Sequence, residues 1–451
     1  MSWATPVKCE RIPLSFSEEL LWRTEREAAT AAPFFDCALT LVIGWRLSNV
    51  PDVKRLTQSV SAVLERQQLL QSRIEQIEDG VYRTNGPATG NECRLLDWRD
   101  APAQDDDASA MALLQQEANR EIDSAVGPLC QSLVIQVSNV EVVLACVFHH
   151  LVFDDWSKRI FAGELEAAYR AWPFKGKRRL SPLKPRHADF VRWEQTQFGG
   201  EAGEVAAVAM MARLAGGSGL RIASASGVGR PRTMTRSLHV SASRTAALQA
   251  AGRARGVTLA VLFLAIFADA LRSVLGSQDV LIGVPIANRR RPDFHRLIGL
   301  FVDTLVVRIN AGSNVDLEQL VLHARGRVTE AYQFQRRLPY GAFVRWKCRR
   351  NIEAPDYPFV FSFHNRIPGE EIQLPGVIAR DLGLLVGRLH KLAEVGVQVA
   401  WEGAGLWCVF SRTERSDNFI DFDQLVEHFT TSISRFSSNG AVGPANGIAL
   451  H

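Results

Sequence analysis

Residues 149–157, His-His-Leu-Val-Phe-Asp-Asp-Trp-Ser, constrain the fold most, because they place four titratable side chains at the end of a buried strand. The preceding run 142–148 is entirely apolar and predicts a buried strand, and a helical pattern starts near Trp156. Buried imidazoles and carboxylates need hydrogen-bond or charge partners. We therefore expect other parts of the chain to supply partners for this stretch.

Three interpretations fit these residues. Neighbouring side chains at a strand end point to opposite sides, so one histidine would face a cavity while Asp154 pairs with a cation from elsewhere. An ordinary strand end followed by an acidic helix N-terminus would have the same pattern, since Asp favours the helix dipole. His150 and Asp154 could also be metal ligands, but no third ligand has a recognisable spacing and HExxH is absent. We expect no metal.

The length of 451 residues exceeds the size at which one hydrophobic core stops growing, which predicts two lobes. The segment 173–185 is rich in Pro, Lys and Arg and has no apolar period. We place the boundary there, with an N-terminal lobe over residues 1–176 and a C-terminal lobe over residues 177–451. The order of expected strands and helices is loosely alike in both halves, which favours two similar α/β lobes.

Composition excludes several classes of protein. A net charge of +4 argues against a nucleic-acid binder that depends on a dense basic face. The seven cysteines are scattered without a CxxC pair, which is typical of reduced thiols in a cytosolic protein. The longest apolar stretch, 257–267, is too short for the roughly 20 residues of a membrane span. We expect a cytoplasmic protein without a membrane contact.

Local patterns predict several elements around these residues. Apolar positions at helical spacing predict an amphipathic helix over residues 52–73. Two strands, 129–137 and 141–148, are expected to form a hairpin that ends at the histidines. A helix follows over residues 155–172, and short strands are expected at 280–286 and 304–309.

The His149-His150 stretch resembles the HHxxxDG signature of condensation domains from nonribosomal peptide synthetases. Other segments resemble further motifs of that family in the same order, over more than 400 residues. These segments are 14–22, 66–73, 187–193, 283–289 (similar to GxPxxGR), 298–308 (similar to IGxFVNTxxxR) and 338–340. Several ordered motifs are far more specific than one short motif.

The resemblance implies an α/β fold of two chloramphenicol-acetyltransferase-like lobes in a V-shaped pseudo-dimer with a central tunnel. A thioester on the phosphopantetheine arm of a carrier protein would enter from one face, and a small-molecule or carrier-bound acceptor from the other. No cofactor would be bound permanently. The chain ends near its closing helix, so we expect a free-standing, monomeric member that receives its carrier protein in trans.

The resemblance also assigns roles. His150 matches the catalytic histidine, and His149 is expected to be structural. Asp154 would form a buried or half-buried ion pair with Arg289, locking the histidine loop against the other lobe. Asp155 and Ser157 would support the active site. The tunnel candidates are Trp156, Asp303 and Asn365.

Three acidic residues depart from the family pattern. Glu18 replaces a glutamine. Asp303 replaces an asparagine, and Asp155 replaces the glycine of HHxxxDG. Glycine lets backbone approach a substrate arm closely, whereas aspartate adds bulk and negative charge. Asp155 could indicate weak activity or an unusual acceptor, or its side chain could turn away as a helix N-cap.

Three functions follow. The first is a condensation enzyme that forms an amide or an ester and could release a finished chain. The second is a catalytically weak module that binds carrier proteins. The third is an acyltransferase that uses a coenzyme A thioester. Epimerisation is disfavoured because no second acidic motif suits it, and heterocyclisation because that subgroup replaces the two histidines with aspartate.

Overall fold

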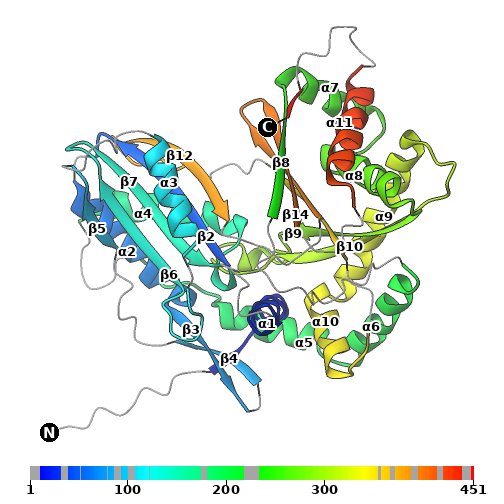
Figure 1. The fold of residues 1–451 in the computed structure, drawn as a ribbon. Coiled ribbons are helices and arrows are strands. Elements are labelled where there is room, and N and C mark those ends of the chain that lie inside the picture. The colour runs from blue at the N-terminus through cyan, green and yellow to red at the C-terminus, as the bar shows by residue number, and fades with distance from the viewer. Residues whose placement is uncertain are drawn as a thin grey trace.

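The computed structural model describes residues 11–31, 39–50, 52–78, 80–85, 93–99, 107–120, 122–173, 180–217, 233–353, 357–365, 371–386, 395–413, 420–438 and 448–450. Two α/β lobes lie side by side and diverge from a common base (Figure 1). Each lobe has its own sheet and its own hydrophobic core.

The first lobe contains a five-stranded sheet in the order β12-β2-β7-β6-β5. Helices α2 and α4 pack against each other beside this sheet, and α3 packs on β2, β7 and β12. The strands are β12 (Ile378–Val386), β2 (Thr40–Ser48), β7 (Glu141–His149), β6 (Cys130–Gln136) and β5 (Arg94–Asp97), and the helices are α2 (Val53–Arg66), α3 (Asp107–Ala118) and α4 (Asp155–Ala171).

The second lobe contains a seven-stranded sheet in the order β10-β9-β11-β13-β14-β8-β15. Helices α7, α8, α9 and α11 pack with one another and with this sheet. The strands are β8 (Thr233–Val240), β9 (Asp279–Ile286), β10 (Asp303–Asn310), β11 (Phe359–His364), β13 (Val395–Glu402), β14 (Gly405–Thr413) and β15 (Ile448–Leu450), and the helices are α7 (Ala242–Ala254), α8 (Leu259–Leu275), α9 (Leu317–Arg337) and α11 (Phe422–Ser438).

The base of the molecule is formed by α1, α5, α6 and α10 together with a small three-stranded sheet, β1-β4-β3 (Figure 1). Helix α10 contacts both α1 and α6. The bounds are α1 (Phe16–Ala31), α5 (His187–Phe198), α6 (Glu201–Leu214), α10 (Tyr340–Arg349), β1 (Arg11–Pro13), β3 (Ser72–Ile77) and β4 (Gly80–Asn85).

The predicted hairpin is confirmed, because β6 pairs antiparallel with β7. One other segment differs from the expectation. The helix expected over residues 52–73 ends at Arg66, and a short 3-10 helix (Gln68–Gln71) leads directly into β3. Leu69 and Leu70 fit a helical period but are buried in this 3-10 turn, so burial rather than helix continuation explains their apolar character.

Strand β12 comes from the C-terminal half of the chain but pairs antiparallel with β2 of the first lobe. Lys158 of α4 donates a hydrogen bond to Asp381 of this strand at 2.6 Å. No local sequence pattern predicts this crossover. The division at residues 176 and 177 stays a prediction.

No single helix among the described residues has both the length and the apolarity that a membrane crossing requires. Helices α7 and α8 pass that test together, bent by 95°, by length and composition only.

Glu194 of α5 joins the start of α1 to the base. Its carboxyl group accepts a hydrogen bond of 2.8 Å from the backbone N–H of Phe16, and its side chain is buried. Burial raises the pKa of Glu194 to about 8, and the nearby carboxylates Asp303 and Glu18 add to the rise although Phe16 and Arg290 oppose it. The residue is therefore protonated at neutral pH.

We expect Glu194→Gln to remove a pH dependence of stability. A carboxyl whose folded pKa exceeds its unfolded value of 4.5 stabilises the fold fully below pH 4.5, and this contribution is lost as pH rises through about 8. Urea unfolding at pH 6 and pH 9 should show wild type losing on the order of a few kcal/mol more than the variant. Equal losses in both proteins would contradict the assignment of a protonated Glu194.

Candidate functional site

The two histidines lie where β7 ends. His149 is buried, and its Nδ1 accepts a hydrogen bond from the backbone N–H of Leu151 at 3.1 Å. Its Nε2 faces Glu25 Oε1 of α1 at 3.2 Å, so the ring donates there. Both ring nitrogens are thus occupied inside the protein, which supports the structural role expected for His149.

His150 is half-buried and has a different environment. Its Nδ1 lies 2.8 Å from the backbone carbonyl of Phe153. A carbonyl only accepts, so Nδ1 carries the proton and Nε2 carries a lone pair. No described residue hydrogen-bonds to Nε2. Burial lowers the pKa of His150 below its ordinary value of 6.5, although the Phe153 carbonyl and the charge of Asp154 oppose this. The ring is therefore neutral at neutral pH.

Asp154 is fully buried and holds the loop together. It caps α4 by accepting from the backbone N–H and the hydroxyl of Ser157, at 2.9 and 2.7 Å. It also accepts from the backbone N–H of Phe301 at 3.1 Å and from Arg289 Nη2 at 2.9 and 3.2 Å. The predicted ion pair between Asp154 and Arg289 is confirmed.

Arg289 belongs to the loop after β9, and its conformation depends on the residue before it. Asn288 has a φ of 49°, in the left-handed region where the GxPxxGR pattern has glycine and where asparagine is also tolerated. The guanidinium then points inward and also donates to the carbonyls of Phe294 and Leu297, at 3.2 and 2.7 Å. The cation is thereby held by Asp154 and by two backbone carbonyls of the β9–β10 connection.

Ser157 connects the same cluster to the second lobe. Its hydroxyl donates to Asp154 and accepts from the backbone N–H of Gly299 at 3.1 Å. Segment 297–301 of the second lobe therefore closes over the N-terminus of α4, and the supporting position expected for Ser157 agrees with these contacts.

Asp155 does not cap the helix, because Asp154 does. Its carboxylate instead reaches the second lobe, where Oδ2 lies 3.4 Å from His364 Nδ1 at the end of β11. Burial would raise the pKa of Asp155, but His364 and Lys158 outweigh it and the pKa is lowered. The side chains of Asp155 and His364 are 35% and 30% exposed, so this contact between lobes remains accessible to small molecules.

His364 is the residue of this site that the sequence analysis missed. Its Nε2 lies 2.8 Å from Gln398 Nε2 and 3.1 Å from the Ser362 hydroxyl. The available signal was a histidine at the end of an expected strand, next to the candidate Asn365. That signal is weak without the contact to Asp155.

The tunnel candidates have separate surroundings. Trp156 donates through Nε1 to the carbonyl of His295 at 3.4 Å. Asp303 is buried and accepts from the backbone N–H groups of Tyr340 and Gly341, so it positions the start of α10. Asn365 is exposed after β11. Their role as tunnel residues stays a prediction.

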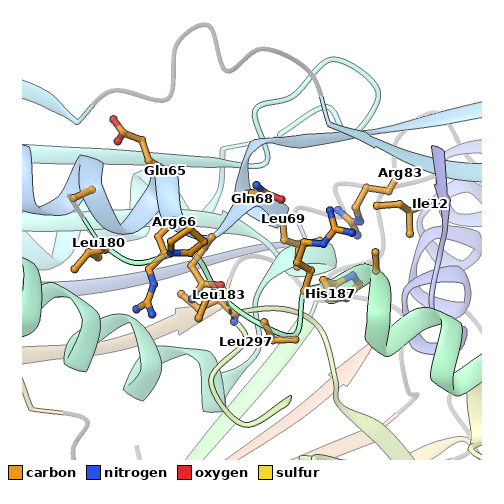
Figure 2. Close-up of a pocket in the computed structure, with 16 residues that line it drawn as sticks. Ile12, Glu65, Arg66, Gln68, Leu69, Arg83, Leu180, Leu183, His187 and Leu297 are labelled. Carbon is orange, nitrogen blue, oxygen red and sulfur yellow. Dashed lines mark hydrogen bonds between the residues drawn. The ribbon is translucent and has the colours of Figure 1, made fainter. Parts of the chain in front are cut away.

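A cavity of about 350 Å³ lies where the first lobe meets the base and residues 297 and 298 of the second lobe (Figure 2). Its lining includes Leu69 of the first lobe, Leu297 of the second lobe, and Arg83 and His187. Arg83 donates to Glu18 at 2.7 Å and to the carbonyl of Leu151 at 3.3 Å, so the cavity borders the back of the histidine loop. His150, Asp154 and Arg289 do not line it.

Glu18 occupies a position where the family usually has glutamine, and the structure compensates its charge. Burial would raise the pKa of Glu18, but Arg83 and His187 lower it to about 2. The carboxylate is therefore paired inside the base.

Among the described residues, no group of three His, Cys, Asp or Glu side chains could hold a metal ion.

We expect Asp154→Asn and Arg289→Met each to lower the free energy of unfolding by about 3–5 kcal/mol, because each leaves a buried group without its ionic partner. The double variant should lose less free energy of unfolding than the sum of the losses in the two single variants. Urea unfolding of all four proteins gives this coupling.

Arg291→Met is the matched control. Its ion pair with Asp293 is 45% and 55% exposed, so its loss should cost under about 1 kcal/mol. Additive effects of Asp154→Asn and Arg289→Met would show that the two charges do not depend on each other.

The sequence model of the Condensation domain family matches residues 45–365. A linear gramicidin synthase of Brevibacillus parabrevis is 27% identical over 432 residues, which are 94% of this chain and 8% of that protein. The chain thus spans a small part of this relative.

Solved structures share the fold. The condensation domain of the Monacolin K polyketide synthase MokA has a TM-score of 0.76 at 17% identity and covers 95% of this chain and 98% of its own. The teicoplanin X-domain in its complex with OxyB has a TM-score of 0.73 at 18% identity, covering 97% and 94%. The expected fold of two chloramphenicol-acetyltransferase-like lobes is confirmed. With the family model matching most of its length, this chain belongs to the Condensation domain family.

Proposed function

We propose that this protein transfers an acyl group from a carrier-protein phosphopantetheine thioester to the amine or hydroxyl of an acceptor, with His150 as the catalytic residue. The observation that carries the proposal is the environment of His150. Its Nδ1 proton is held by the Phe153 carbonyl, and its Nε2 has no hydrogen-bond partner among the described residues. Family membership supports acyl or peptidyl transfer in general.

The geometry fits a proton transfer to Nε2. As the acceptor nitrogen or oxygen attacks the thioester carbonyl carbon, its proton moves to Nε2, which is neutral because burial lowers the pKa of His150. The carbon–sulfur bond then breaks, and the thiolate takes the proton from the imidazolium. Positioning of the two substrates contributes further, since a thioester has a good leaving group.

The Asp154–Arg289 pair supports this role without contacting the substrates in the proposal. It fixes the loop between β7 and α4, so the Phe153 carbonyl stays aligned with Nδ1. A carrier protein supplied in trans, chain release, a free-standing monomer and a cytoplasmic location stay predictions.

We expect His150→Ala to reduce transfer from an acyl-carrier thioester by about 10²–10⁴-fold, because it removes the proton acceptor. For wild type, the acid limb of kcat/KM against pH should fall at a pKa below 6.5, the direction in which burial moves His150. Carrier binding should be unchanged. The measurement is product formation with panels of amines and alcohols, at pH 5 to 9.

His239→Ala is the matched control, because this histidine is 40% exposed on β8 and should leave the rate within about twofold. Retention of full activity by His150→Ala would exclude the proposed role. If the same acyl group is transferred from coenzyme A as fast as from the carrier protein, the result would favour a coenzyme A-dependent acyltransferase instead.

A second candidate function is a carrier-binding or partner-recruiting module of low activity. The observation that favours it is Asp155, a charged side chain at the glycine position that bridges to His364 of the other lobe. The structurally similar teicoplanin X-domain has been solved as a complex with OxyB.

Asp155→Gly separates the two candidates. Because glycine removes the carboxylate and its contact with His364, a module obstructed at this position should gain at least about tenfold in transfer rate. An active enzyme that uses Asp155 should instead lose rate or change its acceptor preference. Glu166→Gly on the same helix, with rates compared per folded protein, controls for glycine in α4.

A further inference from the structure

We propose that a depression on the outer edge of the second lobe binds a phosphate group, as free phosphate or as a phosphate monoester. The depression has a volume of about 440 Å³, within the size range of small-molecule sites. Arginines from three different elements line it. They are Arg213 of α6, Arg308 of β10 and Arg327 of α9.

The charges in the depression do not cancel. Glu330 pairs with Arg213 at 3.2 Å and with Arg327 at 2.8 Å, so one carboxylate serves two guanidinium groups. Arg308 pairs with Asp279 at 2.7 Å. Three arginines therefore face two carboxylates, and one positive charge is in excess.

The arginines also repel one another. Burial lowers the pKa of Arg213, and the positive charges of Arg327 and Arg308 lower it further although Glu330 opposes them. A bound dianion would relieve this repulsion, because each guanidinium favours a phosphate oxygen in charge-assisted hydrogen bonds.

Several donors remain for such a ligand. Of the five N–H groups of Arg327, the described residues take only one, at Nη1. Arg213 uses Nε and Nη2, for Glu330 and the Val306 carbonyl, and leaves Nη1. Phosphate presents several acceptor oxygens and could use donors from both arginines at once.

Two buried polar atoms in the depression are left without a partner among the described residues. They are Nε of Arg327 and Nε2 of His323. Buried polar atoms are usually hydrogen-bonded, so the unpartnered Nε donor of Arg327 beside an excess of positive charge indicates a missing anionic ligand. His323 bonds the Asn310 backbone through its other ring nitrogen and its pKa is lowered, so its Nε2 lone pair suits the P–OH group of hydrogen phosphate. Phe334 lies under Arg213, with 5.2 Å between Cζ and the ring centre, and gives the depression an apolar wall for an organic group.

This site is distinct from the histidine loop. Asp303 and the loop before it contact the base and α4, whereas Arg308 lies five residues further along β10, about 17 Å away at ordinary strand rise. Phosphate binding in the depression therefore does not depend on acyl transfer at His150, and the absence of one function can be recognised without testing the other.

The test is calorimetric titration of the full chain with inorganic phosphate at pH 7 and constant ionic strength. We expect Arg327→Gln to raise the Kd by about tenfold or more, since a charged donor set is removed. Arg325→Gln, on the same helix but outside the depression, should leave the Kd within about twofold. An equal Kd for wild type and Arg327→Gln would overturn the proposal, as would full displacement by an equal ionic strength of chloride.

His323→Ala gives a second variant, because it removes the unpartnered Nε2 without breaking an ion pair. It should also weaken phosphate binding, and circular dichroism confirms folding of each variant. Titration with 4′-phosphopantetheine and with pantetheine identifies the source of the phosphate. Tighter binding of 4′-phosphopantetheine than of phosphate assigns a monoester, and equal affinity assigns free phosphate. Equal binding of pantetheine and 4′-phosphopantetheine would contradict a phosphate site.

Discussion

The buried pair of Asp154 and Arg289 is the interaction on which the geometry of the site depends. The aspartate ends the loop after β7 and caps α4, while the arginine comes from the loop after β9 in the other lobe. Moving two charges out of water is unfavourable unless their pairing geometry and additional hydrogen bonds compensate for the lost hydration. Here the carboxylate accepts from Ser157, Phe301 and Arg289, so the pair specifies how the lobes meet.

The same loop gives the two histidines different chemistry. His149 has both ring nitrogens engaged by Leu151 and Glu25, whereas His150 engages only Nδ1. The difference comes from the alternation of side chains at a strand end, which sends one ring into the first lobe. A neutral ring with one lone pair left over is suited to accept a proton.

Charge substitutions at motif positions are compensated locally. Glu18 gains Arg83 and His187, Asp303 gains backbone donors at the start of α10, and Asp155 gains His364. The first two are buried and stabilise the base. The third is accessible between the lobes, which is why it bears on function rather than on packing alone.

Much of this could be predicted from local patterns. The apolar run before His149 predicted β7, and the resemblance to condensation domains implied that Arg289 would meet Asp154. Two features of the fold were not predicted. Leu69 and Leu70 fitted a continuing helix because a buried 3-10 turn also places apolar residues in succession. The pairing of β12 with β2 was missed because β12 has no local sequence pattern that predicts its partner strand.

The sequence by itself determined the two lobes and the strand that leads to the histidines, because periodicity acts over short distances along the chain, and its resemblance to condensation domains identified the partners of the ion pair. Only the tertiary structure decided which histidine nitrogen is free, that Asp155 faces His364, and that Arg213, Arg308 and Arg327 converge. The last two depend on distances between elements remote in sequence, and folding alone brings them together.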